Sequence, residues 1–113
     1  MRSSSLAAVV ALFAVLPASV LVRAQQLTGS VVGTVKDPSG SLVVGAQVDL
    51  VSSTTGISQS HRTDADGAFL FPAVKPGAYN LLASLSGFKT ASQRLDIELN
   101  KNSKVDFVLM VGM

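Results

Sequence analysis

The stretch RTDADGAFLF, residues 62–71, places two aspartates and a glycine directly before two phenylalanines at alternate positions. Alternating apolar residues predict a β-strand with one buried face, and Phe69 and Phe71 share that face here. Aspartate accepts hydrogen bonds from nearby backbone amides, and glycine adopts positive φ at little steric cost. We therefore predict that residues 64–67 form a tight hairpin turn between two strands.

Two chemical readings of the same aspartates compete with the turn. A helix–loop–helix calcium loop with Gly67 as its sixth residue would begin at Arg62 and end at Ala73. A cation and a methyl group would then occupy positions where that loop needs carboxylates. Acid-pair catalysis needs carboxylates held in a cleft that separates their pKa values, whereas Asp64 and Asp66 are expected in a solvated bend. We prefer the turn, and a cation weakly bound in the loop is the alternative.

Outward from this stretch, the chain reads as short extended segments separated by Gly, Pro, Asn or Asp. No segment after the N-terminal region keeps the apolar period of a helix, which is about 3.6 residues. The seven candidate strands are residues 30–36, 46–51, 56–63, 68–71, 78–86, 94–99 and 104–111. This spacing predicts an all-β sandwich or barrel. Two sheets, each with one apolar face, would bury a core of this size most simply by covering one another.

The alternation also predicts which side chains of the later strands point into the core. The expected inward residues are Tyr79, Leu81, Ala83, Leu85, Leu95, Ile97, Leu99, Val105, Phe107, Leu109 and Val111. All of them are apolar residues in one phase of their strand, so they would line the inner faces of the two sheets.

The first 24 residues have the layout of a secretory signal peptide. Arg2 supplies an early positive charge, residues 6–16 are an unbroken apolar run, and Ala24 ends the segment with a small residue. Spanning a bilayer takes about 20 apolar residues, and Pro17 interrupts this run earlier. We expect an exported protein whose remaining domain, residues 25–113, has no membrane span; an uncleaved anchor is the alternative.

Charge and cysteine content limit the partners of that domain. Without Arg2 and Arg23, the nine basic residues fall to seven, which equals the number of acidic residues. No basic run remains to bind phosphate, so nucleic acid is excluded as an expected partner. The chain has no cysteine, so no disulfide supports this single small domain.

The sequence offers no recognisable catalytic or metal-binding set. A zinc site of the metallocarboxypeptidase kind would need at least two histidines and a carboxylate, but His61 is the only histidine. The serines have no base at a recognisable spacing. We therefore predict no enzymatic activity and no cofactor or metal, and we expect His61 to be a solvated surface residue.

Five short motifs together resemble the carboxypeptidase regulatory-like domain. They are GxVxDxxG, GAxV, TDxxGxFxF, PGxY and GF, at residues 33–40, 45–48, 63–71, 76–79 and 87–88. The resemblance covers residues 30–111 and implies a seven-stranded Greek-key β-sandwich of the transthyretin type. Such domains occur beside metallocarboxypeptidases and at the N-termini of Oar-like TonB-dependent outer-membrane receptors. Val44 stands where the family often has proline, which is expected to loosen that turn without changing the fold.

The motif residues are expected to build turns and a core rather than an active site. The expected turn residues are Gly40, Gly45, Asp64, Asp66, Gly67, Gly77 and Gly87. The expected aromatic centre consists of Phe69, Phe71, Tyr79 and Phe88. Since Tyr79 follows Pro76-Gly77, its ring can enter the core while its hydroxyl contacts the backbone of the turn.

The resemblance implies a non-enzymatic interaction module similar to the periplasmic extension of a TonB-dependent receptor, either stand-alone or truncated. It would then lie in the periplasm, associate with the outer membrane or be secreted, and bind protein partners of the cell envelope. Exposed edge strands bind other chains through backbone hydrogen bonds, and the polar run of residues 52–63 is the expected edge. The alternatives are a carbohydrate-binding module of starch-binding-like fold and a structural spacer. Transthyretin-fold hydrolases acting on 5-hydroxyisourate use several histidines, which this chain lacks.

Overall fold

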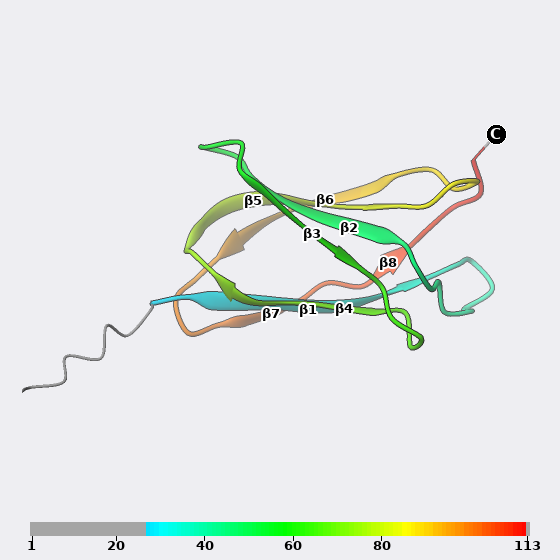
Figure 1. Cartoon of the computed structure of the whole chain (residues 1–113), viewed down its shortest axis with the longest axis horizontal. Coiled ribbons are helices and arrows are strands. Elements are labelled where there is room, and N and C mark those ends of the chain that lie inside the picture. The colour runs from blue at the N-terminus through cyan, green and yellow to red at the C-terminus, as the bar shows by residue number, and fades with distance from the viewer. Residues whose placement is uncertain (1–26, 113) are drawn as a thin grey trace, which may run out of the picture.

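The computed structural model describes residues 27–112, which form eight strands and no helix (Figure 1). The strands are β1 (Gly29–Lys36), β2 (Gln47–Ser52), β3 (Ser58–Arg62), β4 (Ala68–Val74), β5 (Gly77–Ser84), β6 (Ala91–Ile97), β7 (Asn102–Lys104) and β8 (Phe107–Val108). No helix within these residues is therefore long and apolar enough to cross a membrane. The predicted signal peptide, residues 1–24, lies outside the described residues.

The strands form two sheets that face each other as separate layers in Figure 1. One sheet has the order β4-β1-β7, with β8 also paired to β1, and the other has the order β3-β2-β5-β6. β7 and β8 run parallel to β1, whereas all other neighbouring strands are antiparallel. The predicted all-β sandwich is confirmed.

The last predicted strand, residues 104–111, is divided in the structure where Val105 lies closely beside Gly33 of β1. A Cβ atom at Gly33 would lie 1.6 Å from the carbonyl oxygen of Val105, so only glycine permits this close approach. Asp106 follows, and its Oδ1 accepts hydrogen bonds from Thr34 N at 3.1 Å and Thr34 Oγ1 at 2.9 Å. A side chain thus replaces the backbone acceptor at the point between β7 and β8 where the parallel ladder with β1 is interrupted.

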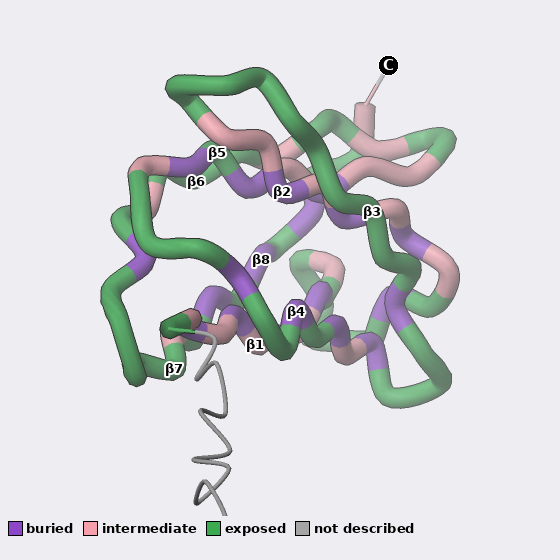
Figure 2. Tube along the Cα trace, turned by 60° about the vertical axis from the view of Figure 1, so that its left-hand side comes forward, coloured by how far each residue is buried: buried purple, intermediate pink, exposed green. Residues whose placement is uncertain are grey.

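The core lies between the sheets, where the buried segments of Figure 2 face one another. It contains sixteen buried apolar residues, including alternate residues of β1, β2, β4 and β5. Phe69 is 2% exposed and its ring centre lies 6.2 Å from that of Phe71 and 6.3 Å from that of Phe107. Aromatic contacts at these distances add to the stabilisation that burial of the rings already provides.

Two residues predicted to point inward are exposed instead. Leu99 is 41% exposed because β6 ends at Ile97, and Leu99 lies in the turn that follows. Val111 is 68% exposed because it lies beyond β8 and makes only an isolated bridge to Phe88. The apolar alternation continues in the sequence past the point where each strand ends, so the prediction was wrong at these positions.

Candidate interaction edge

The turn in the opening stretch has the expected hydrogen bonds. Asp64 Oδ1 accepts hydrogen bonds from Asp66 N at 2.8 Å and from Ala68 N at 2.9 Å, and Gly67 N donates to Asp64 O at 2.9 Å. The turn does not close a hairpin, however, because β3 and β4 belong to different sheets. The chain uses these residues to cross from one layer to the other, so the hairpin was a wrong prediction.

Thr63, directly before this turn, is a buried polar residue that joins two loops. Its Oγ1 donates to Val43 O at 2.7 Å and accepts a hydrogen bond from Ala46 N at 2.9 Å. Its backbone N–H donates to Ala46 O at 2.9 Å. Since Thr63 is only 4% exposed, these hydrogen bonds satisfy its buried polar atoms and fix the end of β3 against the start of β2. From the sequence, Thr63 was only a member of the TDxxGxFxF motif, and its buried hydrogen bonds were not predicted.

The structure places the predicted aromatic residues at different depths. Phe69, Phe71 and Tyr79 are buried, and Tyr79 Oη donates to Lys75 O at 2.7 Å, which is a turn carbonyl. Phe88 is only partly buried and packs against the rim of the core, because it lies after the end of β5. The third ring at the centre of the aromatic cluster is therefore Phe107 rather than Phe88.

Of the predicted turn glycines, Gly40, Gly45, Gly67 and Gly87 lie between strands, and Gly77 is the first residue of β5. Their φ angles are positive at Gly40, Gly45, Gly67, Gly77 and Gly87. At Gly67 there is also no room for a side chain, since a Cβ atom would lie 2.9 Å from the carbonyl oxygen of Val35. Gly67 is thus required both by the turn conformation and by close approach to β1.

β3 is an edge strand, and every one of its five residues is exposed. Two hydrogen bonds fix the direction of its backbone groups: Thr63 N donates to Ala46 O, and Ser52 N donates to Ile57 O. Odd-numbered residues from 57 to 63 therefore face β2. Because backbone groups alternate in direction along an antiparallel strand, the N–H and C=O groups of Ser58, Ser60 and Arg62 point away from the sheet. The polar edge predicted from residues 52–63 is therefore an edge with unpaired backbone groups within the described part of the chain.

A groove lies beside the start of this edge and is lined by residues from both sheets. It has a volume of about 340 Å³. Its lining residues are Ser52, Thr54, Thr55, Ile57, Gln59, Ala73, Lys75, Pro76 and Tyr79. Ile57 is 69% exposed, so the groove offers an apolar side chain directly beside the polar edge strand.

β4, the neighbouring edge of the other sheet, has few available backbone groups. Val35 N donates to Gly67 O, so Ala68 and Leu70 face outward in the regular part of the β1–β4 ladder, which ends with a register shift after Phe71. The backbone of Ala68 is already paired, because its N–H donates to Asp64 Oδ1 and its carbonyl accepts from Asp64 N. Leu70 therefore supplies the one free outward amide of this regular part, and Pro72, which has no N–H, follows it, so this edge is poorly suited to strand addition.

The two remaining edges are also less suitable than β3. The edge formed by β7 and β8 has strands of three and two residues, and the close approach of Val105 to Gly33 separates them. Ser53 N donates to Ala78 O, so even-numbered residues of β5 hydrogen bond to β2 and its odd-numbered residues to the odd-numbered residues of β6. The outward residues of β6 are therefore Ser92, Arg94 and Asp96. Charged side chains on an edge strand are a common protection against unwanted pairing.

The only histidine lies on the candidate edge, but the described residues around it do not form a metal site. His61 is exposed, and its ring centre is 6.0 Å from that of Phe71. Within residues 27–112, no three His, Cys, Asp or Glu side chains lie close enough together to hold a metal ion.

Two aspartates have perturbed ionisation, and both act as structural acceptors away from this edge. Hydrogen bonding by the Ser39 hydroxyl at 2.6 Å, with the amides of Ser39 and Ser41, lowers the pKa of Asp37. Hydrogen bonding by Thr34, followed by weaker contributions from nearby lysines, lowers the pKa of Asp106. Lowered carboxyl pKa values of this kind belong to ionised groups that accept several hydrogen bonds.

Comparison with solved structures finds this sandwich in proteins of different activities. Catechol 1,2-dioxygenase from Acinetobacter radioresistens matches with a TM-score of 0.59 and 11% identity, over 79% of this chain and 53% of the enzyme. A streptococcal ancillary pilin matches with a TM-score of 0.62 and 15% identity, over 77% of this chain and 33% of the pilin. The 5-hydroxyisourate hydrolase of Klebsiella pneumoniae matches with a TM-score of 0.59 and 22% identity, over 75% of this chain and 87% of the hydrolase.

These likenesses show the fold alone, because all three identities are below 25%. The chain spans about half the length of the dioxygenase. No curated protein sequence matches it. The family model of the carboxypeptidase regulatory-like domain matches residues 30–110, which cover nearly all of the described structure. The chain therefore belongs to the carboxypeptidase regulatory-like domain family.

Proposed function

We propose that this protein is a non-enzymatic interaction module that binds an extended segment of another protein along β3. The observation that carries the proposal is the row of outward backbone groups at Ser58, Ser60 and Arg62, which the described chain does not pair. A segment added to this edge would form a ladder of backbone hydrogen bonds and extend the sheet by one strand. Backbone pairing supplies affinity in this mode, whereas pockets for alternate side chains supply specificity.

The groove next to β3 provides such a pocket. Alternate side chains of an added strand point to the inner side of the sheet, where Ile57 and Ala73 line the groove. These residues favour an apolar side chain at that position of the partner. Lys75 at the same groove favours a neighbouring acidic residue.

The cellular setting belongs to the same proposal. The layout of residues 1–24 supports export, and the family resemblance supports the periplasm or the outer membrane as the place of action. A module of this kind would act as the extension that precedes the plug of a TonB-dependent receptor, or as a stand-alone copy of it. Its partners would be proteins of the cell envelope.

The proposal is tested by affinity capture from an envelope extract with wild-type protein and a Ser60→Pro variant. The N–H of Ser60 points away from β2, so proline there removes an outward donor without breaking the β2–β3 ladder. We expect specific partners to bind the wild type and to be lost from the variant. Ser60→Ala is the matched control, since it keeps the N–H and should retain them. Equal capture by all three proteins would exclude β3 as the binding edge.

Carbohydrate binding is the competing function, and the described residues give it little support. Phe69, Phe71, Tyr79 and Phe107 are each at most 8% exposed, so these rings present no platform on which a sugar can stack. Binding to a glycan array that survives Ser60→Pro would favour the carbohydrate function over the one proposed here.

A further inference from the structure

We infer that β3 also binds a second copy of this chain, through two-fold antiparallel pairing of the two β3 strands centred on Ser60. This inference uses the same edge as the proposed function and goes beyond it by naming a partner. Two-fold interfaces are self-complementary, so the edge must match itself when it is reversed. β3 meets this requirement in its backbone, its charges and its access.

The backbone requirement is met by the spacing of the outward residues. With Ser60 on the two-fold axis, Ser60 faces Ser60 of the second copy, and Ser58 faces Arg62 of the second copy. All these residues direct both N–H and C=O outward, so each facing pair exchanges two hydrogen bonds. The three pairs satisfy every outward backbone group of both strands, and the two four-stranded sheets become one continuous sheet.

The charge requirement separates β3 from β6, the other uninterrupted edge of this sheet. Reversal of β6 about its central outward residue would place Arg94 opposite Arg94 of the second copy. Like charges directly opposite each other destabilise a strand pair. On β3 the central residue is the uncharged Ser60, and Arg62 faces a serine, so no like charges meet.

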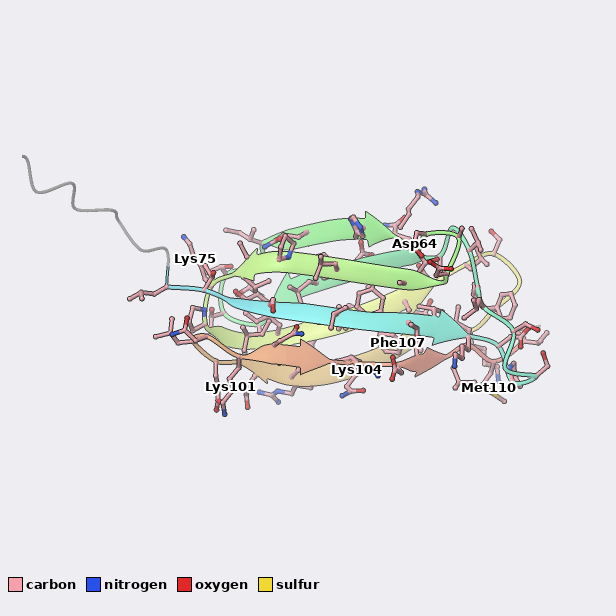
Figure 3. The ribbon with its side chains drawn as sticks, turned by 90° about the horizontal axis from the view of Figure 1, so that it is seen from below. Asp64, Lys75, Lys101, Lys104, Phe107 and Met110 are labelled. Carbon is pink, nitrogen blue, oxygen red and sulfur yellow. The ribbon has the colours of Figure 1, made fainter. Side chains whose placement is uncertain are left out.

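Access to β3 is open. Figure 3 shows β3 (green) as the outermost strand on its side of the molecule, beyond β4 of the other sheet. The outward residues have short side chains at Ser58 and Ser60, which allow another backbone to approach. On the inner side, His61 lies opposite Gln59 of the second copy, where their polar groups can hydrogen bond.

The size of the edge sets the strength of the association. Specific, stable interfaces bury about 1,200 Å² or more in total, whereas this pairing makes contacts only along one strand of five residues. The dimer is therefore weak and forms only as the protein concentration rises. It also covers the edge proposed for partner binding, so self-association and partner binding are mutually exclusive and compete for the same backbone groups.

The experiment is sedimentation equilibrium of the purified protein over a wide concentration range, with three variants. We expect the wild type and Ser60→Ala to show a concentration-dependent dimer, because both keep the outward N–H of residue 60. We expect Ser60→Pro to remain monomeric at every concentration. Ser92→Pro removes an outward donor from β6 instead and should dimerise like the wild type.

Amide hydrogen exchange of the wild type provides a readout that does not depend on any variant folding. The amides of Ser58, Ser60 and Arg62 should exchange more slowly as concentration rises, whereas those of Ser92 and Arg94 should not change. A wild type that stays monomeric, with exchange at β3 independent of concentration, would overturn the inference. Partner capture that is still lost in Ser60→Pro would then leave the proposed function standing, so the two failures are distinguishable.

Discussion

The substitution Gly33→Ala tests the closest backbone approach in this fold. The added Cβ atom would lie 1.6 Å from Val105 O and 2.7 Å from the tip of the Phe69 ring. Contacts of Cβ atoms below 3.0 Å are essentially never found, so the segment carrying Val105 must retreat by about 1.4 Å. In an ordinary strand, the same substitution would stabilise the protein by roughly 0.5–1 kcal/mol.

The retreat breaks identifiable contacts. Val105 N donates to Val32 O at 2.9 Å, and Asp106 accepts two hydrogen bonds from Thr34. Each hydrogen bond contributes about 1 kcal/mol net, and partial exposure of Val105 adds about 1 kcal/mol. After subtraction of the favourable strand effect, we expect Gly33→Ala to lower the free energy of unfolding by about 3 kcal/mol. That is a large part of the 5–15 kcal/mol typical of a domain.

Urea denaturation followed by circular dichroism measures this change. With a slope of about 1.5 kcal/mol per molar urea, the midpoint should fall by roughly 2 M. Gly56→Ala is the control: its Cβ would meet nothing within 4 Å, so only its positive φ of 73° carries a cost, about 1 kcal/mol. A Gly33→Ala variant as stable as the wild type would refute the close approach of Val105 to Gly33.

Three further predictions concern the core, the turn and acid stability. Phe69→Ala should lower the free energy of unfolding by about 3–5 kcal/mol, measured by the same denaturation, since this ring is buried at the centre of the aromatic cluster. Tyr79→Phe should cost about 1 kcal/mol by calorimetry, because it removes only the hydrogen bond to Lys75 O. The pKa values of Asp37 and Asp106 are below their ordinary value of 3.8, so the unfolded state binds protons first on acidification. Their contribution to stability is complete above about pH 4 and is lost as pH falls through the lowered pKa values, so urea midpoints should fall below pH 4, and less steeply in Asp106→Asn.

Much of the fold follows from sequence alone, because local chemistry decides it. Alternation at Phe69 and Phe71 is a property of neighbouring residues, and it gave the correct buried face of β4. The polarity of residues 52–63 likewise indicated an exposed edge. These features need no knowledge of what lies across the core.

Contacts between distant segments were decided only by the tertiary structure. Sequence could not show that β3 and β4 join different sheets, because a five-residue connection closes a hairpin as readily as it crosses between layers. Nor could it show that Val105 lies closely beside Gly33, a contact between residues far apart in the chain. The backbone N–H and C=O of Ser60 point outward because the odd-numbered residues of β3 hydrogen bond to β2. Pairing with β2, rather than composition, decides whether the odd- or the even-numbered residues do so.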